Sequence, residues 1–183
     1  MVKKVILGIL VLILIVIVGL LAVVAMQSDD MKVTRSVSMN APPDRVFEQV
    51  NDFHKWEAWS PWAKVDPNMK TTFSGAPSGV GSSYAWTGND AVGEGKMTIT
   101  KSQPSQQIGI DLEFIKPFTA TNQTDFVFAP QGNSTNVTWT MTGKKNFMMK
   151  AFCMVMDTDK MVGADFEKGL AQLKAVAEFP VAQ

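Results

Sequence analysis

The sequence predicts an α+β fold in which an antiparallel sheet is followed by a long C-terminal helix, with a separate apolar helix at the N-terminus. Residues 5–26 contain no charged or polar side chain. Between residues 81 and 142, apolar and polar residues alternate in several short segments, which is typical of strands with one buried and one solvated face. Residues 156–178 instead place apolar side chains at helical spacing.

The apolar run at residues 5–26 is long enough to cross a membrane. As a helix rising about 1.5 Å per residue it spans about 33 Å, close to the roughly 30 Å thickness of a hydrocarbon core. Cleaved signal peptides have shorter apolar regions of about 7–15 residues, so we expect an uncleaved single-span anchor. Cleavage stays an alternative, because the small residues at positions 22–25 satisfy the cleavage rule.

The charged residues that flank this run predict its orientation. Lys3 and Lys4 precede it, whereas Asp29 and Asp30 follow it. Positive charge stays on the cytoplasmic side, so we expect a cytoplasmic N-terminus in a single-pass inner (plasma) membrane protein. The globular part would then lie in the periplasm, or otherwise outside the cytoplasm, close to the bilayer.

The overall composition argues against several classes of function. The chain carries 17 Lys and Arg against 17 Asp and Glu, which gives no sign of the basic surface that nucleic-acid binding requires. Cys153 is the only cysteine and His54 the only histidine, so the chain has no basis for an internal disulfide or a metal site built on His and Cys. We expect no metal, no cofactor and no nucleic-acid partner, and the sequence identifies no protein partner.

Residues 31–183 form one predicted domain, and residues 1–30 comprise a cytoplasmic stub, the apolar helix and a short linker. A strand is expected at residues 32–39. Pro42-Pro43 then suits the first turn of a helix, where a missing N–H costs nothing. A second short helix ends before Pro61, because the residue before a proline disfavours helical geometry.

Alternating apolar residues predict about six further strands, which are separated by turns rich in Gly and Pro. The clearest alternation occurs at residues 81–87, 94–100, 108–114, 125–128 and 137–142. The last third becomes helical again, with a short helix from about Asn146 and a long helix from about Met156 to Glu178.

This order of elements resembles the SRPBCC superfamily of helix-grip domains, in its membrane-anchored bacterial type. The string PPDRVF at residues 42–47, the trailing Trp56, Trp59 and Trp62, and the helix at residues 156–170 carry the resemblance, which covers roughly residues 31–179. The superfamily includes START lipid-binding proteins, polyketide cyclase/dehydrase relatives and proteins similar to the birch-pollen allergen. The resemblance implies a curved antiparallel sheet wrapped around the final helix, with a hollow between them.

The apolar faces of the strands and of the long helix predict the wall of that hollow. A closed core without a hollow is the alternative, because periodicity alone cannot distinguish the two. The predicted ligand-binding residues are Tyr84, Trp86, Met97, Ile99, Ile110, Leu112, Phe114, Phe126, Phe128, Trp139, Met141, Met161, Val162 and Phe166.

Four further apolar residues are candidates for a gate or lid over the hollow. Trp59 and Trp62 belong to the tryptophan triplet, and Met148 and Phe152 to the methionine-rich segment at residues 147–156. The alternative for each of them is ordinary packing, which we favour for Trp59.

No motif in the chain identifies catalytic residues. The Gly-x-Ser-x-Gly signature is missing, His54 is flanked by solvent-type residues, and Cys153 lies in an apolar neighbourhood that favours an inert thiol. The preferred hypothesis is therefore a membrane-tethered domain that binds a hydrophobic small molecule or lipid without chemistry. One alternative is a cyclase/dehydrase-type enzyme acting on an apolar carbonyl compound; another is a filled-core partner in the cell envelope that works through its surface.

Overall fold

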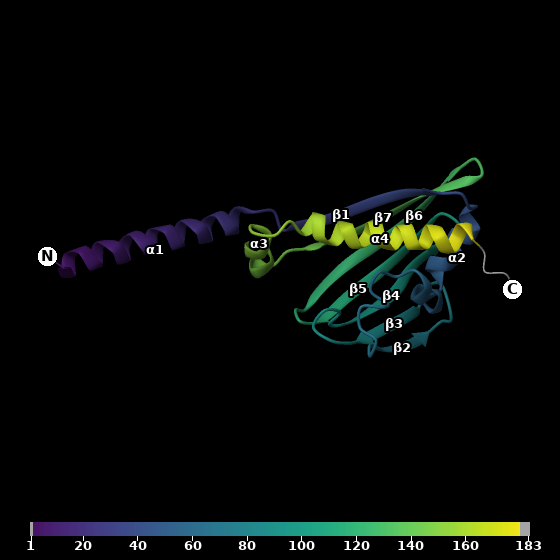
Figure 1. Cartoon of the computed structure of the whole chain (residues 1–183), viewed down its shortest axis with the longest axis horizontal. Coiled ribbons are helices and arrows are strands. Elements are labelled where there is room, and N and C mark those ends of the chain that lie inside the picture. Colours follow the sequence, from purple (N-terminus) through teal and green to yellow (C-terminus); the bar gives the residue numbers. More distant parts are fainter. Residues whose placement is uncertain (1, 180–183) are drawn as a thin grey trace.

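The computed structural model describes residues 2–179 and shows an α+β helix-grip domain with a long helix attached (Figure 1). In chain order the elements are α1 (Val2–Met26), β1 (Asp30–Met39), α2 (Pro43–Asn51), the 3-10 helix η1 (Phe53–Ala58), β2 (Lys70–Gly75), β3 (Ser82–Thr87), β4 (Glu94–Gln103), β5 (Gln107–Lys116), β6 (Ala120–Gln131), β7 (Ser134–Lys144), α3 (Phe147–Cys153) and α4 (Thr158–Glu178).

The seven strands form one antiparallel sheet in the order β1-β7-β6-β5-β4-β3-β2. Strands β2 to β7 are sequential neighbours, and β1 adds to the far side of β7, where Val33 pairs with Met141. The predicted one-sided antiparallel sheet is confirmed. The sequence of β2 shows no clear alternation of apolar and polar residues because all six of its residues are exposed.

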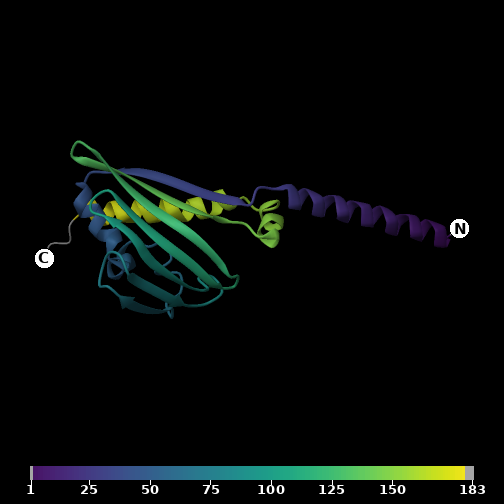
Figure 2. The ribbon, with the colours of Figure 1, turned by 180° about the vertical axis from the view of Figure 1, so that it is seen from behind.

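Helix α4 packs along the concave face of the sheet, where both ribbon views place it across the strands (Figures 1 and 2). Phe166, Leu170, Leu173 and Ala177 recur at helical spacing, and all four are buried against the sheet side. The Asp157 carboxylate caps the helix by accepting a hydrogen bond from the backbone N–H of Lys160 at 3.0 Å. The long C-terminal helix is therefore confirmed, with a start two residues later than predicted.

Helices α2 and η1 pack beside α4 and contribute to the same core. Val46, Phe47 and Val50 bury the apolar stripe of α2. The indole N–H of Trp56 donates to the carbonyl oxygen of Val50 at 2.9 Å, and that of Trp59 donates to Gln49 at 3.1 Å. These two bonds satisfy the polar edges of the indoles, so both rings can be buried at little cost.

Helix α1 extends away from the domain as a single straight rod (Figure 1). It is long and apolar enough to span a membrane, with a mean hydropathy of 3.5 in its most apolar window. A signal sequence near an N-terminus has the same character. Three residues, 27–29, connect α1 to β1.

Candidate ligand-binding site

The space between the sheet and the middle of α4 is filled by stacked aromatic rings. Trp139 of β7 stacks on Phe166 of α4 with ring centroids 4.0 Å apart, and the ring of Phe126 of β6 also stacks on Trp139, at 4.8 Å. Trp59 meets the Trp139 ring edge-on at 5.9 Å. Side chains from the sheet, α4 and the segment after η1 therefore occupy the position where the resemblance implied a hollow.

Most of the predicted wall residues are brought together in this core, although not around a pocket. The buried ones are Ile99, Ile110, Phe126, Phe128, Trp139, Met141 and Phe166. The partly buried ones that pack against them are Tyr84, Met97, Leu112 and Val162. Trp86 and Phe114 contact each other at 6.1 Å at the margin of the sheet, while Met161 lies exposed on α4.

The four candidate gate or lid residues separate into two groups. Trp59 is fully buried, and Trp62 is half-buried with its ring edge-on to both Trp139 and Phe166. These two tryptophans pack against the core. Met148 and Phe152 of α3 are exposed and lie at the end of the domain that adjoins α1.

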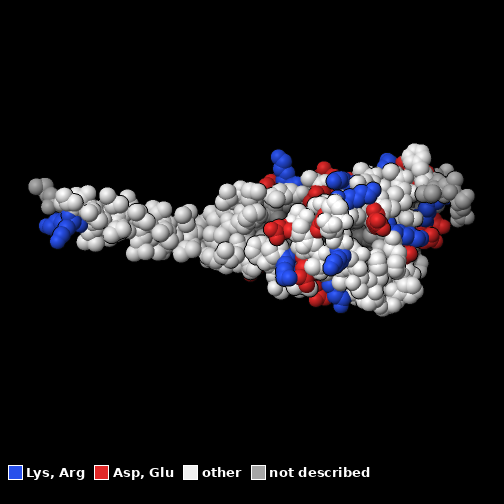
Figure 3. Space-filling view, turned by 60° about the horizontal axis from the view of Figure 1, so that its bottom comes forward, with Lys and Arg blue, Asp and Glu red and all other residues white. Residues whose placement is uncertain are grey.

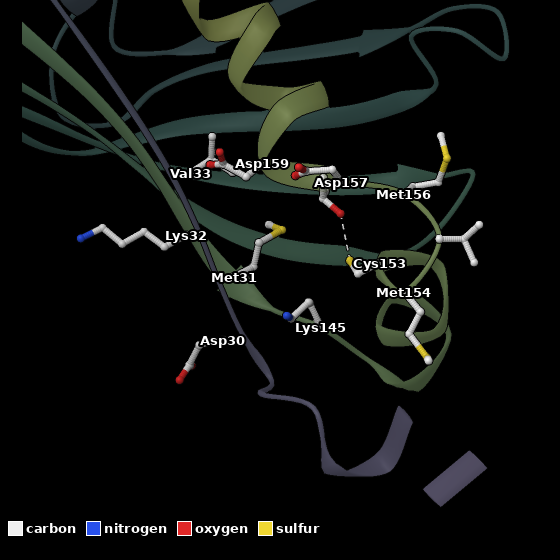
Figure 4. Close-up of a pocket in the computed structure, with 12 residues that line it drawn as sticks. Asp30, Met31, Lys32, Val33, Lys145, Cys153, Met154, Met156, Asp157 and Asp159 are labelled. Carbon is white, nitrogen blue, oxygen red and sulfur yellow. Dashed lines mark hydrogen bonds between the residues drawn. The ribbon is translucent and has the colours of Figure 1, made fainter. Parts of the chain in front are cut away.

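A pocket of about 550 Å³ lies at the same end of the domain, away from the filled core (Figure 4). It is formed by the start of β1 (residues 30–33), by Lys145 and by the α3–α4 connection with the helix residues on either side of it (residues 153–159 in all). None of these residues was among the predicted wall residues. The nearest sequence signal was the methionine-rich segment, which overlaps the pocket at residues 153–156.

The alternation of β1 decides which of its side chains enter the pocket. Met31 points toward Cys153, whereas Asp30 and Lys32 project to the other side of the strand (Figure 4). The Cys153 thiol and the Thr158 hydroxyl form a hydrogen bond of 2.9 Å, which links the end of α3 to the start of α4. Met154 and Met156 extend outward from the rim, so the inner wall combines Met31 with the Cys153–Thr158 pair.

Lys145 gives the pocket a cationic group. The two acidic residues at the start of α4 are already engaged, since Asp157 caps the helix and Asp159 forms an ion pair of 3.0 Å with Arg35. Hydrogen bonds to Asp159 and then to Glu167 raise the pKa of Arg35. Lys145 forms no salt bridge within residues 2–179. Its positive charge helps to lower the pKa of the nearby Asp29 carboxyl, although the two form no direct ion pair.

Lys150 connects α3 to the linker that follows α1. Its ammonium group forms an ion pair with Asp29 and lies 3.5 Å from the carbonyl oxygen of Ala25. The hydrogen bond from Lys150, followed by its charge, lowers the pKa of Asp29. The pocket wall formed by the α3–α4 connection is thus attached to the end of α1.

Among the predicted wall residues, all of which lie within the described residues 2–179, Tyr84 is the one with a shifted pKa. Burial raises the pKa of its phenol, and the negative charge of Glu57 raises it further. A phenol with a raised pKa stays neutral at physiological pH, so Tyr84 behaves as a packing residue with a polar edge.

Comparisons with known proteins agree with this architecture. Residues 30–178 match the family described as polyketide cyclase / dehydrase and lipid transport. The fold is similar to that of protein Mll3558 from Rhizobium loti, which is 19% identical with a TM-score of 0.61, covering 81% of this chain and 98% of that one. No curated protein matches the sequence.

Two further solved structures share the fold at low identity. Protein CV1439 from Chromobacterium violaceum is 15% identical with a TM-score of 0.58, covering 82% of this chain and 98% of its own. Ara h 8.0201 is 10% identical with a TM-score of 0.57, covering 81% and 97%. The family match extends over the whole helix-grip domain, from the first residue of β1 to the last residue of α4. The chain therefore belongs to the polyketide cyclase/dehydrase and lipid transport family of the SRPBCC superfamily.

Proposed function

We propose that this protein binds a hydrophobic small molecule of the lipid class in the pocket between β1 and the α3–α4 connection, and that α1 tethers it to the membrane. The observation that carries the proposal is the position of the pocket at the end of the domain that adjoins the C-terminal end of α1. Its volume of about 550 Å³ suits a small ligand or one acyl chain.

The side chains around the pocket favour an amphiphile with an anionic group. Met31 offers apolar surface, and a methionine side chain adapts to chains of different shape. Lys145 offers a cation without a salt-bridge partner in the described residues. A fatty acid, or a lipid with an acidic head group, would place its chain against Met31 and its charge at Lys145.

The tether supports the same function. A domain held a few residues from the bilayer meets membrane lipids at a much higher effective concentration than a free domain does. The lysines at the start of α1 favour an arrangement with the N-terminus in the cytoplasm and the domain on the opposite, periplasmic side.

The test is photolabelling of the full-length chain in nanodiscs with a diazirine-bearing fatty acid, followed by peptide mapping. We expect saturable labelling of peptides that contain residues 30–33 and 153–159. Met31→Trp, which would occupy the pocket, should reduce that labelling, whereas Val80→Trp in the exposed β2–β3 turn should not. Labelling that does not saturate, or that Met31→Trp leaves unchanged, would refute the proposal.

A separate incubation tests for an enzymatic function. Carbonyl compounds incubated with the full-length chain should be recovered with unchanged mass if the protein only binds them. Loss of water, or a cyclised product that forms only with the protein, would favour the cyclase/dehydrase alternative.

A further inference from the structure

We propose that α3 and the residues that follow it dock into the interfacial layer of the lipid bilayer that α1 crosses. The docking surface, which we call the α3 apolar surface, consists of six side chains that are each at least 40% exposed. They are Phe147, Met148, Phe152, Met154, Val155 and Met156. The inference rests on α1 being retained as a membrane span, and it does not require the pocket to hold a ligand.

In helix α3 the charged side chain is buried and the apolar side chains are exposed, which is the opposite of what is expected for a helix in water. Its cation, Lys150, is buried, with 8% of the residue exposed, whereas Met148 is 73% exposed. A short surface helix in water turns apolar side chains inward and lysines outward. The ion pair with Asp29 holds Lys150 toward the linker, which leaves the apolar side chains facing outward. Apolar surroundings would stabilise this arrangement.

The α3 apolar surface lies directly beside the end of α1. Helix α3 contacts α1, and the Lys150 ammonium reaches the carbonyl oxygen of Ala25, one residue before α1 ends. Figure 3 shows that the uncharged surface of α1 continues onto the adjoining end of the domain on this face, before charged residues begin. If α1 spans the bilayer, α3 is therefore held at the depth of the lipid head groups.

A further exposed apolar side chain lies at the same end of the sheet. Phe118, in the turn between β5 and β6, is 68% exposed. The start of β6 pairs with the end of β7, where Asn122 lies opposite Gly143, and the end of β7 pairs with the start of β1. The sheet end that bears Phe118 is therefore the end next to α1 and α3.

The charges around the α3 apolar surface favour docking by apolar contact. Lys144 forms an ion pair with Asp30, and Lys150 forms one with Asp29, so neither lysine is free to attract anionic lipids. Among residues 2–179 this leaves Lys145, in the pocket, as the one lysine of residues 144–150 without an ion-pair partner, against six exposed apolar side chains. Docking through basic residues weakens as salt is added, whereas burial of apolar side chains does not. We therefore expect the contact to form with zwitterionic phosphatidylcholine and to persist at high salt.

Docking would also determine whether the pocket opens toward lipid or toward water. Met154, Val155 and Met156 belong both to the α3 apolar surface and to the rim of the pocket. Immersion of these three residues would bring the rim against lipid, so that an apolar ligand could enter without crossing water.

The experiment uses the full chain reconstituted in phosphatidylcholine vesicles that contain a lipid with a nitroxide near its head group. In a Cys153→Ser background, which removes the only cysteine, Val155→Cys and Val80→Cys each carry an environment-sensitive NBD fluorophore. Val155 is 86% exposed between α3 and α4, and the control Val80 is 58% exposed in the β2–β3 turn at the other end of the sheet.

We expect blue-shifted emission and strong nitroxide quenching at position 155, little of either at position 80, and no change on raising the salt. Adding Met148→Asp should reverse the blue shift at position 155, whereas Val80→Asp should leave that shift unchanged.

Equal quenching at the two positions would overturn the proposal. A blue shift at 155 without lipid quenching would also overturn it and would indicate contact with a second copy or another protein. Fatty-acid photolabelling of the pocket is read separately, so failure of docking and failure of ligand binding can be distinguished.

Discussion

The indole ring of Trp139 and the phenyl ring of Phe166 lie 4.0 Å apart between centroids, with their planes 7° from parallel. This contact joins β7 to α4 and closes the middle of the helix-grip core. Both side chains are almost completely buried. We therefore expect the stability of the fold to depend strongly on this aromatic pair.

Phe166→Ala should therefore lower the free energy of unfolding by about 3–5 kcal/mol, because it leaves a cavity and removes the face of Trp139 from contact. Val80→Ala, at an exposed turn, should change it by about 0.5 kcal/mol or less. Urea unfolding of the full-length chain in detergent, followed by tryptophan fluorescence, measures both. If the two variants unfolded at the same urea concentration, the pair would not be central to the core.

The ion pair between Lys150 and Asp29 should be visible in the titration of Asp29. The contact lowers the pKa of this carboxyl below its ordinary value of 3.8, so its contribution to stability is complete above pH 3.8 and disappears as the pH falls through the lowered value. NMR of the Asp29 carboxyl carbon in the full-length chain should show the depressed pKa. Lys150→Gln should return the pKa toward 3.8, and Lys101→Gln on β4 should not. An unchanged titration in Lys150→Gln would contradict the contact.

Lys145 should discriminate between ligands by charge, if the pocket binds amphiphiles. Lys145→Gln is expected to weaken binding of a fatty acid about threefold to tenfold, because a partly exposed cation contributes a modest attraction to a carboxylate. The corresponding fatty alcohol should bind both proteins equally. Competition against the photolabel in nanodiscs gives the two affinities, with Lys168→Gln on the exposed side of α4 as the control. Equal losses for acid and alcohol would mean that Lys145 supports the pocket without contacting the head group.

The orientation of the chain can be determined by cysteine labelling. In the Cys153→Ser background, Asn133→Cys lies in the exposed turn between β6 and β7, and Val2→Cys lies at the other end of α1. A membrane-impermeant maleimide applied to intact bacterial spheroplasts should label position 133 and label position 2 only after lysis. Mass spectrometry of the purified chain should find residues 1–30 retained. Labelling of position 2 in intact cells would reverse the proposed topology.

Periodicity was sufficient to predict most of the elements and, for α4 and β6, the buried side, whereas the exposed strand β2 and the exposed Met161 did not follow from it. The spacing of Phe166, Leu170 and Leu173 determines one face of α4 whatever it packs against, and the alternation of Phe126 and Phe128 does the same for β6. These patterns are local, so the α+β class, the antiparallel sheet, the order of elements and the long apolar helix could all be predicted from the sequence.

Whether a buried face encloses a hollow depends on side chains that come from other parts of the chain. Trp59 lies 80 residues before Trp139 in the sequence, yet its ring occupies the core beside it. Similarly, the pocket requires Met31 and Cys153, which are brought together because β1 pairs with β7 and α3 follows directly from β7. The spacing of residues along the chain carries no information about such packing. The sequence alone was therefore enough for the fold, whereas the filled centre and the pocket beside α1 follow from the three-dimensional contacts between distant segments.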